Sequence, residues 1–178
     1  LNSNGEFLHP EEVQKVIKET KRIQSNKEKP GNLSSYANAL DDHINLILSQ
    51  NFINKNNIAS KSIAVAVDGI NSVGGVAIPK FLESLGIKKI KKINCNPDGN
   101  FNHNPEPLPE NITDLCSEVK SGKYQLGIVV DPDADRLVLV DERGEPFGEE
   151  YTLVAAAEYL LSKNHGASTC SNLSSTLA

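Results

Sequence analysis

The sequence of 178 residues predicts an α/β fold, in which helices flank a layered, mixed but mostly parallel sheet. Three observations predict it. Short apolar runs alternate along the chain with stretches whose apolar residues have helical spacing. Two of these runs are almost continuously apolar, as in strands that are covered on both faces. Glycines and prolines stand between the segments, where turns and loops are expected.

The composition is that of an ordinary, mildly acidic globular protein. Hydrophobic residues make up 38%, charged residues 23%, and the net charge is −5. This balance excludes a wholly disordered chain and argues against nucleic acid or an acidic membrane surface as a partner. No apolar run reaches the roughly 18–20 residues of a membrane helix, and the first residues lack the basic and apolar regions of a signal peptide. We therefore expect a cytoplasmic protein.

The first part of the chain is predicted to form two helices joined by a linker. Pro10 suits the first turn of a helix, and the two glutamates after it favour the helix N-terminus. The polar residues 25–32 contain Pro-Gly and predict the linker. Residues 33–48 then show helical spacing, with Ser34 or Ser35 expected to cap the helix, and an Asn-rich turn follows at residues 51–57.

Strands and helices are expected to alternate through the centre of the chain. The predicted elements, in order, are a buried strand at residues 63–67, a glycine-bearing loop at 68–75, a helix ended by Gly86, an edge strand at 89–95, a proline-rich extended loop at 97–109, a helix from about Pro109 to Gly122, and a second buried strand at 125–130. A strand at 137–140, a tight turn at 142–145, a helix at about 150–162 and a strand at 169–173 complete the prediction.

The cysteines and histidines do not indicate a zinc site. Cys95, Cys116 and Cys170 are widely spaced, without a Cys-x-x-Cys pair, and the four histidines lie apart from them in the sequence. We expect three reduced thiols, mostly buried.

The segment with the clearest chemistry is the loop Asp131-Pro132-Asp133-Ala134-Asp135-Arg136, between two apolar runs. Two like charges about 4 Å apart repel by on the order of 4 kcal/mol at an effective dielectric of about 20. Three carboxylates on so short a loop therefore favour a bound cation. Hard oxygen ligands with coordination positions left open suit Mg²⁺ better than zinc. The guanidinium of Arg136 adds a planar fork that can grip a phosphate through two bonds.

The same loop admits other interpretations. A calcium loop of the EF-hand type would use the three aspartates and Glu142, but it needs glycine where Arg136 stands and helices where apolar strands are predicted. A haloacid-dehalogenase-type phosphatase would use Asp131 as nucleophile and Asp133 as acid/base, although its signature has Thr or Val at the fifth position, where this chain has Asp135. A non-catalytic cation-binding α/β module, or a solvated acidic turn, remains a further alternative.

Three neighbouring features carry weaker signals. Asp68 ends a buried strand at the same predicted sheet edge as the acidic loop, and a structural role is favoured for it over a contact with the metal loop. His103 lies in the extended loop, where bracing of the backbone is the default and facing a cleft the alternative. Gly74 and Gly75 are better explained by close packing of the next helix on the sheet than by a phosphate-binding turn, because no Gly-x-Gly-x-x-Gly is present.

The loop from Asp131 to Arg136 resembles the metal-binding loop of the α-D-phosphohexomutases, the superfamily of bacterial phosphoglucomutases and phosphomannomutases. Other segments support the resemblance in order and spacing from about Ala64 to Ser175, namely Asn71-Ser72-Val73-Gly74-Gly75, Gly99-Asn100-Phe101, His103-Asn104-Pro105-Glu106-Pro107, Gly148-Glu149-Glu150-Tyr151-Thr152 and Ser171-Asn172-Leu173-Ser174-Ser175.

This resemblance implies an enzyme that interconverts 1-phospho and 6-phospho sugars through a phosphoserine and a bisphosphorylated sugar. It implies Asp131, Asp133 and Asp135 as ligands of Mg²⁺, Arg136 as a contact of phosphate near the phosphoserine, and a phosphorylated sugar, most simply a hexose phosphate, as substrate. No serine of the chain stands in the surroundings of the family's phosphoserine, so this piece alone is expected to be inactive.

The same resemblance implies a division of the chain among domains. Residues 1–32 would be the end of a first domain and a linker, residues 33–146 the central domain with the metal loop, and residues 147–178 the start of a third domain. The chain begins with Leu1 and contains no methionine, which suggests a fragment. Its partners would then be the remaining domains of the same polypeptide.

Overall fold

The computed structural model describes residues 1–21 and 31–170. It divides into two compact units, residues 1–36 and 37–178. In the first unit, helix α1 (Pro10–Thr20) begins at the predicted proline, and the backbone N–H of His9 donates to the Glu12 carboxylate at 2.8 Å. The predicted linker at 25–32 falls largely outside the described residues.

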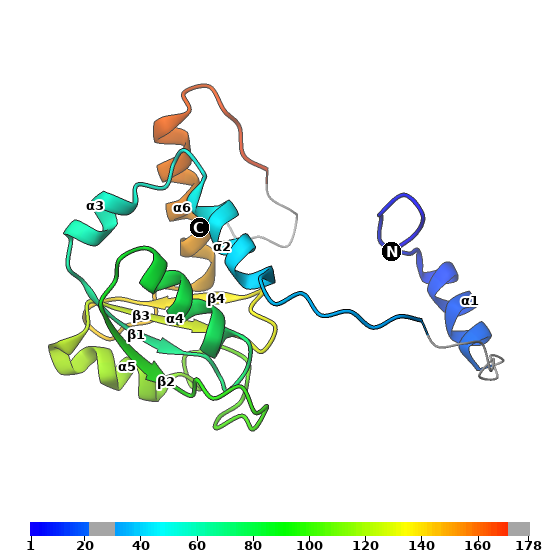
Figure 1. The fold of residues 1–178 in the computed structure, drawn as a ribbon, viewed down its shortest axis with the longest axis horizontal. Helices are drawn as coiled ribbons and strands as arrows, with labels where there is room; N and C mark the ends of the chain where they lie inside the picture. The colour runs from blue at the N-terminus through cyan, green and yellow to red at the C-terminus, as the bar shows by residue number, and fades with distance from the viewer. Residues whose placement is uncertain (22–30, 171–178) are drawn as a thin grey trace. The chain divides into compact units, whose positions relative to one another are not determined.

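A four-stranded sheet forms the centre of the second unit, in the order β2-β1-β3-β4 (Figure 1). Strands β1 (Ala64–Asp68), β2 (Lys89–Ile93) and β3 (Leu126–Val130) are parallel, and β4 (Leu137–Val140) runs antiparallel to β3. The prediction of a mixed, mostly parallel sheet is confirmed. The lysine-rich β2 lies at the edge as predicted, with no buried residue in it.

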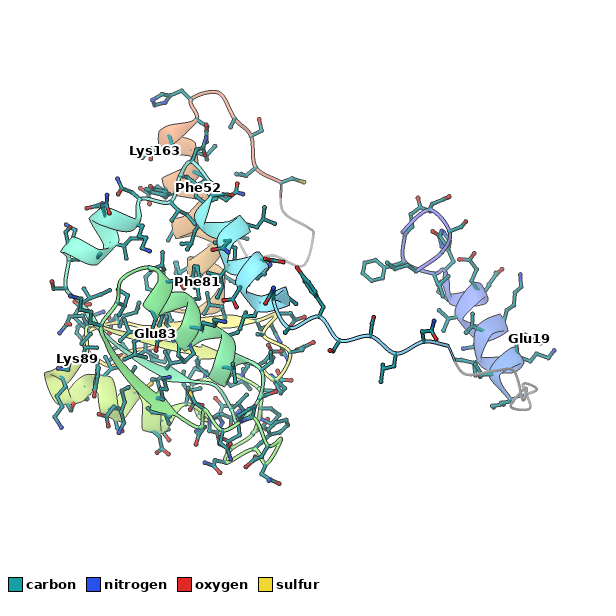
Figure 2. The ribbon with its side chains drawn as sticks, viewed as in Figure 1. Glu19, Phe52, Phe81, Glu83, Lys89 and Lys163 are labelled. Carbon is teal, nitrogen blue, oxygen red and sulfur yellow. The ribbon has the colours of Figure 1, made fainter. Side chains whose placement is uncertain are left out.

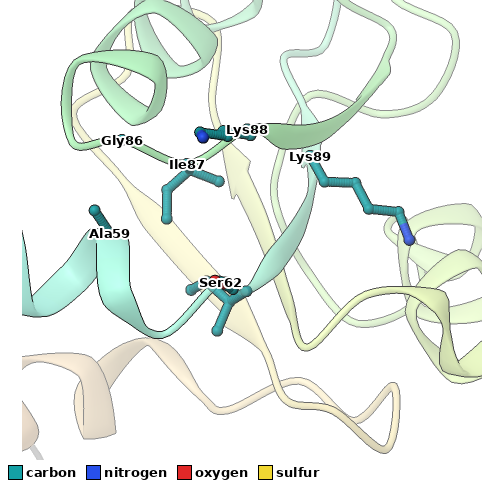
Figure 3. A pocket seen from close by; sticks show the side chains of 7 residues that line it. Ala59, Ser62, Gly86, Ile87, Lys88 and Lys89 are labelled. Atoms are coloured by element: carbon teal, nitrogen blue, oxygen red, sulfur yellow. The ribbon is translucent and has the colours of Figure 1, made fainter.

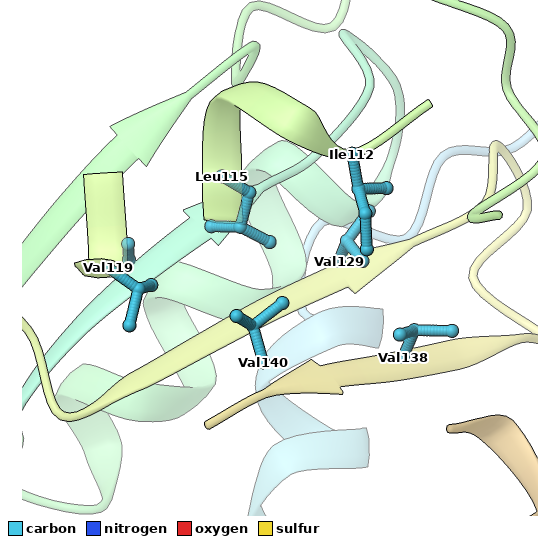
Figure 4. Close-up of a cluster of buried hydrophobic side chains, with 7 residues drawn as sticks. Ile112, Leu115, Val119, Val129, Val138 and Val140 are labelled. Carbon is cyan, nitrogen blue, oxygen red and sulfur yellow. The ribbon is translucent and has the colours of Figure 1, made fainter. Parts of the chain in front are cut away.

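Helices cover both faces of this sheet. The helix α5 (Thr113–Glu118) and the π-helical turn η1 (Val119–Lys123) cover one face, where their side chains meet Ala66 and alternate residues of β3 and β4 (Figure 4). The buried residues of this cluster are Ala66, Ile112, Leu115, Val119, Val129, Val138 and Val140. Alternation of side chains along the strands explains why Val65, Val67 and Ile128 face the other side.

The second face is covered mainly by α4 (Gly74–Ser84), which contributes buried Leu82 and partly buried Phe81 (Figure 2). Leu48 of α2 (Ala39–Leu48) and Ile58 of α3 (Lys55–Ser60) pack against the same cluster. The helix α6 (Glu149–Lys163) follows β4. The architecture is therefore a three-layer α/β/α arrangement, and none of its described helices combines the length and apolarity needed to cross a membrane.

Several predicted boundaries were wrong. The helix expected from residue 33 begins only at Ala39, because Leu33 and Tyr36 are exposed and gain no burial from a helical conformation. Its first flanking residue is Asn38, so neither Ser34 nor Ser35 caps it. The helix expected from about Pro109 likewise starts at Thr113.

The Asn-rich segment contains a helix that was not predicted. The Asn54 side chain accepts a hydrogen bond from the Asn57 N–H at 2.9 Å and so caps α3. At the far end of the chain, residues 167–170 have no regular structure, and the rest of the predicted strand at 169–173 lies outside the described residues. The cysteines were expected to be mostly buried, but Cys95 and Cys116 are only half-buried and Cys170 is exposed.

Candidate metal centre

The carboxyl ends of β1 and β3 bring the candidate site together. The two strands are parallel neighbours, and Asp68 pairs in register with Val129, two residues before Asp131. Both aspartates are only 1% exposed, at the edge of the sheet where α/β proteins bind ligands. The prediction that Asp68 and the acidic loop share one sheet edge is confirmed.

The acidic loop, residues 131–136, is a tight connection between β3 and β4. The Ala134 N–H donates to the Asp131 carbonyl at 3.0 Å, and Ala134 adopts a left-handed backbone with φ of 59°. The loop brings together one carboxylate oxygen from each of Asp131, Asp133 and Asp135, all within 4.8 Å of one another. Asp131 is buried, while the other two side chains face solvent.

This arrangement fits a small, hard cation. At a Mg²⁺–oxygen distance of about 2.1 Å, adjacent oxygens of an octahedral shell are about 3 Å apart and opposite ones about 4 Å. The observed spread, with all three oxygens within 4.8 Å of one another, is close to these separations. Three carboxylates also leave coordination positions for water and phosphate oxygen, as Mg²⁺ sites require.

The pKa shifts of the loop carboxylates reflect the repulsion among their negative charges, which a bound cation would relieve. A hydrogen bond shared with Asp131, together with the negative charge of Asp133, raises the pKa of Asp135. For Asp131, burial alone would raise the pKa, but hydrogen bonds from the Arg136 backbone and guanidinium outweigh burial and lower it. The environment thus lowers the pKa of the buried Asp131 and raises that of the exposed Asp135.

Arg136 connects this cluster to a distant segment of the chain. Its backbone N–H and its Nε donate to the two carboxylate oxygens of Asp131 at 3.1 and 2.9 Å. Its Nη1 and Nη2 both donate to the carboxylate of Glu106, the Nη2 bond being 3.1 Å long. Three of the five guanidinium N–H groups are thereby engaged, which leaves one on each Nη for a further acceptor.

Asp68 belongs to a separate polar cluster at the same edge. Its carboxylate accepts from the backbone N–H of Ile70 at 3.0 Å and from Nδ2 of Asn94 at 3.1 and 3.2 Å. The Nε2 of His103 lies 3.0 Å from Asp68 Oδ2, and its Nδ1 lies 2.8 Å from the Asn104 carbonyl. Asp68 therefore fastens the loop after β2 to the end of β1, which is the structural role favoured by the sequence.

The loop between β1 and α4 supports the acidic loop from the side. Ser72 Oγ donates to the carbonyl of Pro132 at 2.6 Å. The first turn of α4, which follows this loop, is closely packed, because a Cβ on Gly75 would lie 2.6 Å from the Cα of Cys95 and one on Gly74 would lie 2.2 Å from Val130 Cγ2. Close packing was the favoured explanation of Gly74 and Gly75, and it is confirmed.

The structure brings the four predicted site residues together, and it adds two that were missed. In the sequence Glu106 stands out only as part of a proline-rich segment, and its pairing with Arg136 spans thirty residues. Ser72 stands in the glycine-bearing loop, and its bond to Pro132 was not predicted. No local pattern in the sequence reports either contact.

A pocket lies at the opposite edge of the sheet. It is lined by residues at the end of α3, before β1 and at the start of β2, among them Ala59, Ser62, Gly86, Ile87, Lys88 and Lys89 (Figure 3). These positions are at the amino ends of the parallel strands, away from the acidic loop. Because ligands of such sheets bind at the carboxyl ends, we do not assign this pocket to the site.

Comparisons with known proteins show which family this fold belongs to. Residues 41–144 match the family model described as phosphoglucomutase/phosphomannomutase, alpha/beta/alpha domain II. The chain is 36% identical over 118 residues to a phosphoglucomutase of Neisseria gonorrhoeae, an alignment covering 65% of this chain and 25% of that protein. It is 39% identical over 110 residues to the phosphomannomutase/phosphoglucomutase of Pseudomonas aeruginosa, covering 61% of this chain and 24% of the relative.

A solved structure extends the similarity. The crystal structure of a phosphoglucomutase/phosphomannomutase family protein from Burkholderia thailandensis superposes with a TM-score of 0.66 and 25% identity, covering 90% of this chain and 33% of that one. The chain thus spans a quarter to a third of the length of these proteins. On the matched residues and the shared α/β/α architecture, it belongs to the phosphoglucomutase/phosphomannomutase family, of which it contains domain II.

Proposed function

We propose that this chain is the metal-binding central domain of a phosphosugar mutase, which interconverts 1-phospho and 6-phospho sugars through a phosphoserine and a bisphosphorylated intermediate. The observation that carries the proposal is the gathering of three carboxylates at the end of β3, in a domain of this family. The names of the relatives, phosphoglucomutase and phosphomannomutase/phosphoglucomutase, support a hexose phosphate as the substrate.

In this proposal Asp131, Asp133 and Asp135 hold Mg²⁺, which when bound would neutralise charge on the phosphoryl group being transferred. Arg136 contributes positive charge beside it. Its two N–H groups not engaged by Asp131 and Glu106 are the donors available to a phosphate oxygen. Because phosphoryl transfer depends chiefly on positioning and charge stabilisation, such a domain would supply a large part of catalysis without a nucleophile of its own.

The phosphoserine would come from another part of the same polypeptide. Ser72, the serine nearest in sequence to a glycine-rich turn, already donates its hydroxyl to the Pro132 carbonyl and supports the loop. Residues 33–146 would form the central domain, flanked by the end of a first domain (1–32) and the start of a third (147–178). A cytoplasmic location, with no nucleic acid or membrane partner, stays a prediction from the sequence.

Activity measurements on the chain and on the full polypeptide test the proposal. We expect no conversion of glucose 1-phosphate or mannose 1-phosphate by the 178-residue chain, and Mg²⁺-dependent conversion by the full polypeptide. Asp135→Asn in the full polypeptide should lower kcat by about 100-fold, since it removes one of three charges that hold the metal. Asp114→Asn, the same change at an exposed position of α5, should have little effect.

Two outcomes would contradict the proposal. One is a full polypeptide that binds Mg²⁺ but converts no phosphosugar, as a non-catalytic cation-binding module would. The other is an unchanged kcat of Asp135→Asn, which would show that the acidic loop does not take part in the reaction.

A further inference from the structure

We propose that Glu106 is a positioning residue of the metal centre. It holds the guanidinium of Arg136 on Asp131 and beyond hydrogen-bond distance of Asp135, so that the loop carboxylates keep lone pairs available to a divalent cation. This inference rests on the proposed role of the three aspartates as metal ligands, and adds to it a residue that lies outside the acidic loop.

The contacts of Arg136 are the first support. Its guanidinium lies between two carboxylates, with Nε on Asp131 and the Nη1/Nη2 edge on Glu106. A planar guanidinium held at two edges by hydrogen bonds has a fixed orientation. Since the same Arg136 donates both its backbone N–H and its Nε to Asp131, that orientation also fixes the buried carboxylate.

The backbone around Glu106 is itself held in place. Pro105 and Pro107 flank Glu106, which restricts its conformation. The Glu106 N–H donates to Asn104 Oδ1 at 3.1 Å, and its carbonyl accepts from Asn111 Nδ2 at 2.8 Å. Three residues earlier, His103 is bound to the buried Asp68 at the end of β1. The Glu106 side chain therefore extends from a rigid support.

The alternative position of Arg136 explains why this support matters. Its Nε already lies 3.8 Å from Asp135 Oδ1, and the side chain is 40% exposed, so solvent leaves room for movement. A guanidinium released by Glu106 would be drawn to Asp133 and Asp135 by their negative charge. There it would compete with a cation for the same oxygens, and the affinity for metal would fall.

Titration of the chain with Mg²⁺ by calorimetry tests this inference. Glu106→Gln, which keeps the shape of the side chain but not its charge, should weaken Mg²⁺ binding by about 10-fold, as changes behind metal ligands commonly do. The matched control is Glu110→Gln, an exposed glutamate of the same loop, which should change the affinity by less than about twofold because its charge is screened by solvent. Far-UV circular dichroism checks that both variants fold.

A second measurement needs no metal. In the unchanged chain the Arg136 Nε–H, identified by its loss in Arg136→Lys, should exchange slowly with water because Asp131 and Glu106 hold the guanidinium. Glu106→Gln should speed this exchange by at least about 10-fold, and Glu110→Gln should leave it unchanged. If Glu106 served only to hold its own loop, Glu106→Gln would change neither the Arg136 Nε–H exchange rate nor the Mg²⁺ affinity more than Glu110→Gln does.

The outcomes separate this inference from the proposed function. Equal Mg²⁺ affinities of Glu106→Gln and Glu110→Gln, or an unchanged Arg136 Nε–H exchange rate, would overturn the role of Glu106 alone. Absence of Mg²⁺ binding by the unchanged chain, or normal binding by Asp133→Asn, would overturn the metal centre itself. Selective weakening by Glu106→Gln, together with faster exchange, would support both.

Discussion

Asp133→Asn is expected to abolish measurable Mg²⁺ binding by the chain without loss of the fold. Asp133 is an exposed member of the carboxylate cluster, so an amide of the same size can replace it without disturbing the core. The change removes one of the three charges that attract the cation. It also relieves repulsion on Asp135, whose pKa is raised by its hydrogen bond with Asp131 and by the charge of Asp133. The metal-free variant should therefore be no less stable than the unchanged chain.

Calorimetry measures Mg²⁺ binding by the unchanged chain and by Asp133→Asn, and thermal unfolding measures the stability of both. Three carboxylates without a phosphoserine oxygen should bind Mg²⁺ only weakly, with a dissociation constant on the order of millimolar. At about ten times that concentration, Mg²⁺ should raise the free energy of unfolding of the unchanged chain by about 1.4 kcal/mol. The variant should show neither heat of binding nor stabilisation, whereas Asp114→Asn should show both. Equal stabilisation of Asp133→Asn would place the cation elsewhere.

Gly75→Ala is expected to destabilise the second unit by about 3 kcal/mol, at the upper end of the usual cost of overpacking. A Cβ at this position would lie 2.6 Å from the Cα and 2.9 Å from the carbonyl carbon of Cys95. These are backbone atoms, so no side-chain rotation removes the clash. Relief would require α4 to move away from the end of β2, which would also displace Ser72 from Pro132 in the acidic loop.

Urea unfolding of two glycine variants measures this effect. Gly99 has a left-handed backbone with φ of 75°, but no atom lies within 4 Å of the place that a Cβ would take, so Gly99→Ala should cost only about 1 kcal/mol of backbone strain. Gly75 lies in a helix, where alanine without the clash would be stabilising by about 1 kcal/mol. A Gly75→Ala chain as stable as Gly99→Ala would therefore show that the close approach is not a constraint.

The sequence predicts the parts of the fold that depend on local apolar pattern. Val65, Ala66 and Val67, and likewise Ile128, Val129 and Val130, form unbroken apolar runs because β1 and β3 are central strands with helices on both faces. The lysine-rich composition of β2 and the lack of buried residues in it follow from its place at the edge. The antiparallel β4 follows from the short loop before it, since a parallel partner would need a long crossover.

Helix boundaries were predicted less well, because tertiary contacts decide them. Leu33 and Tyr36 continue the helical spacing of α2, but both are exposed, and the helix begins only after Asn38. Conversely, α3 is only six residues long. It depends on the Asn54 cap and on Ile58, which packs against the buried cluster between the sheet and α4. A short helix of this kind has little periodicity by which to be recognised.

The contacts of the candidate site likewise divide into local ones, which the sequence predicts, and long-range ones, which it does not. Asp131, Asp133 and Asp135 lie on one short loop, so their sequence spacing was enough to predict that they gather. Arg136 was expected to face a phosphate, and that role stays a prediction. Its observed partners are Asp131 within the loop and Glu106 in a segment folded back from thirty residues earlier. Contacts between distant segments depend on how loops return to the sheet edge, which one sequence does not report.

The central claim is that the end of β3 holds a divalent cation on three aspartates, and crystals of the chain soaked in Mn²⁺ test it most directly. Mn²⁺ prefers the same oxygen ligands as Mg²⁺ and gives an anomalous signal that locates it. We predict a single strong peak within about 2.3 Å of one oxygen from each of Asp131, Asp133 and Asp135, with water at the remaining positions. A peak bound elsewhere, or a loop that stays empty while Arg136 covers Asp135, would contradict it.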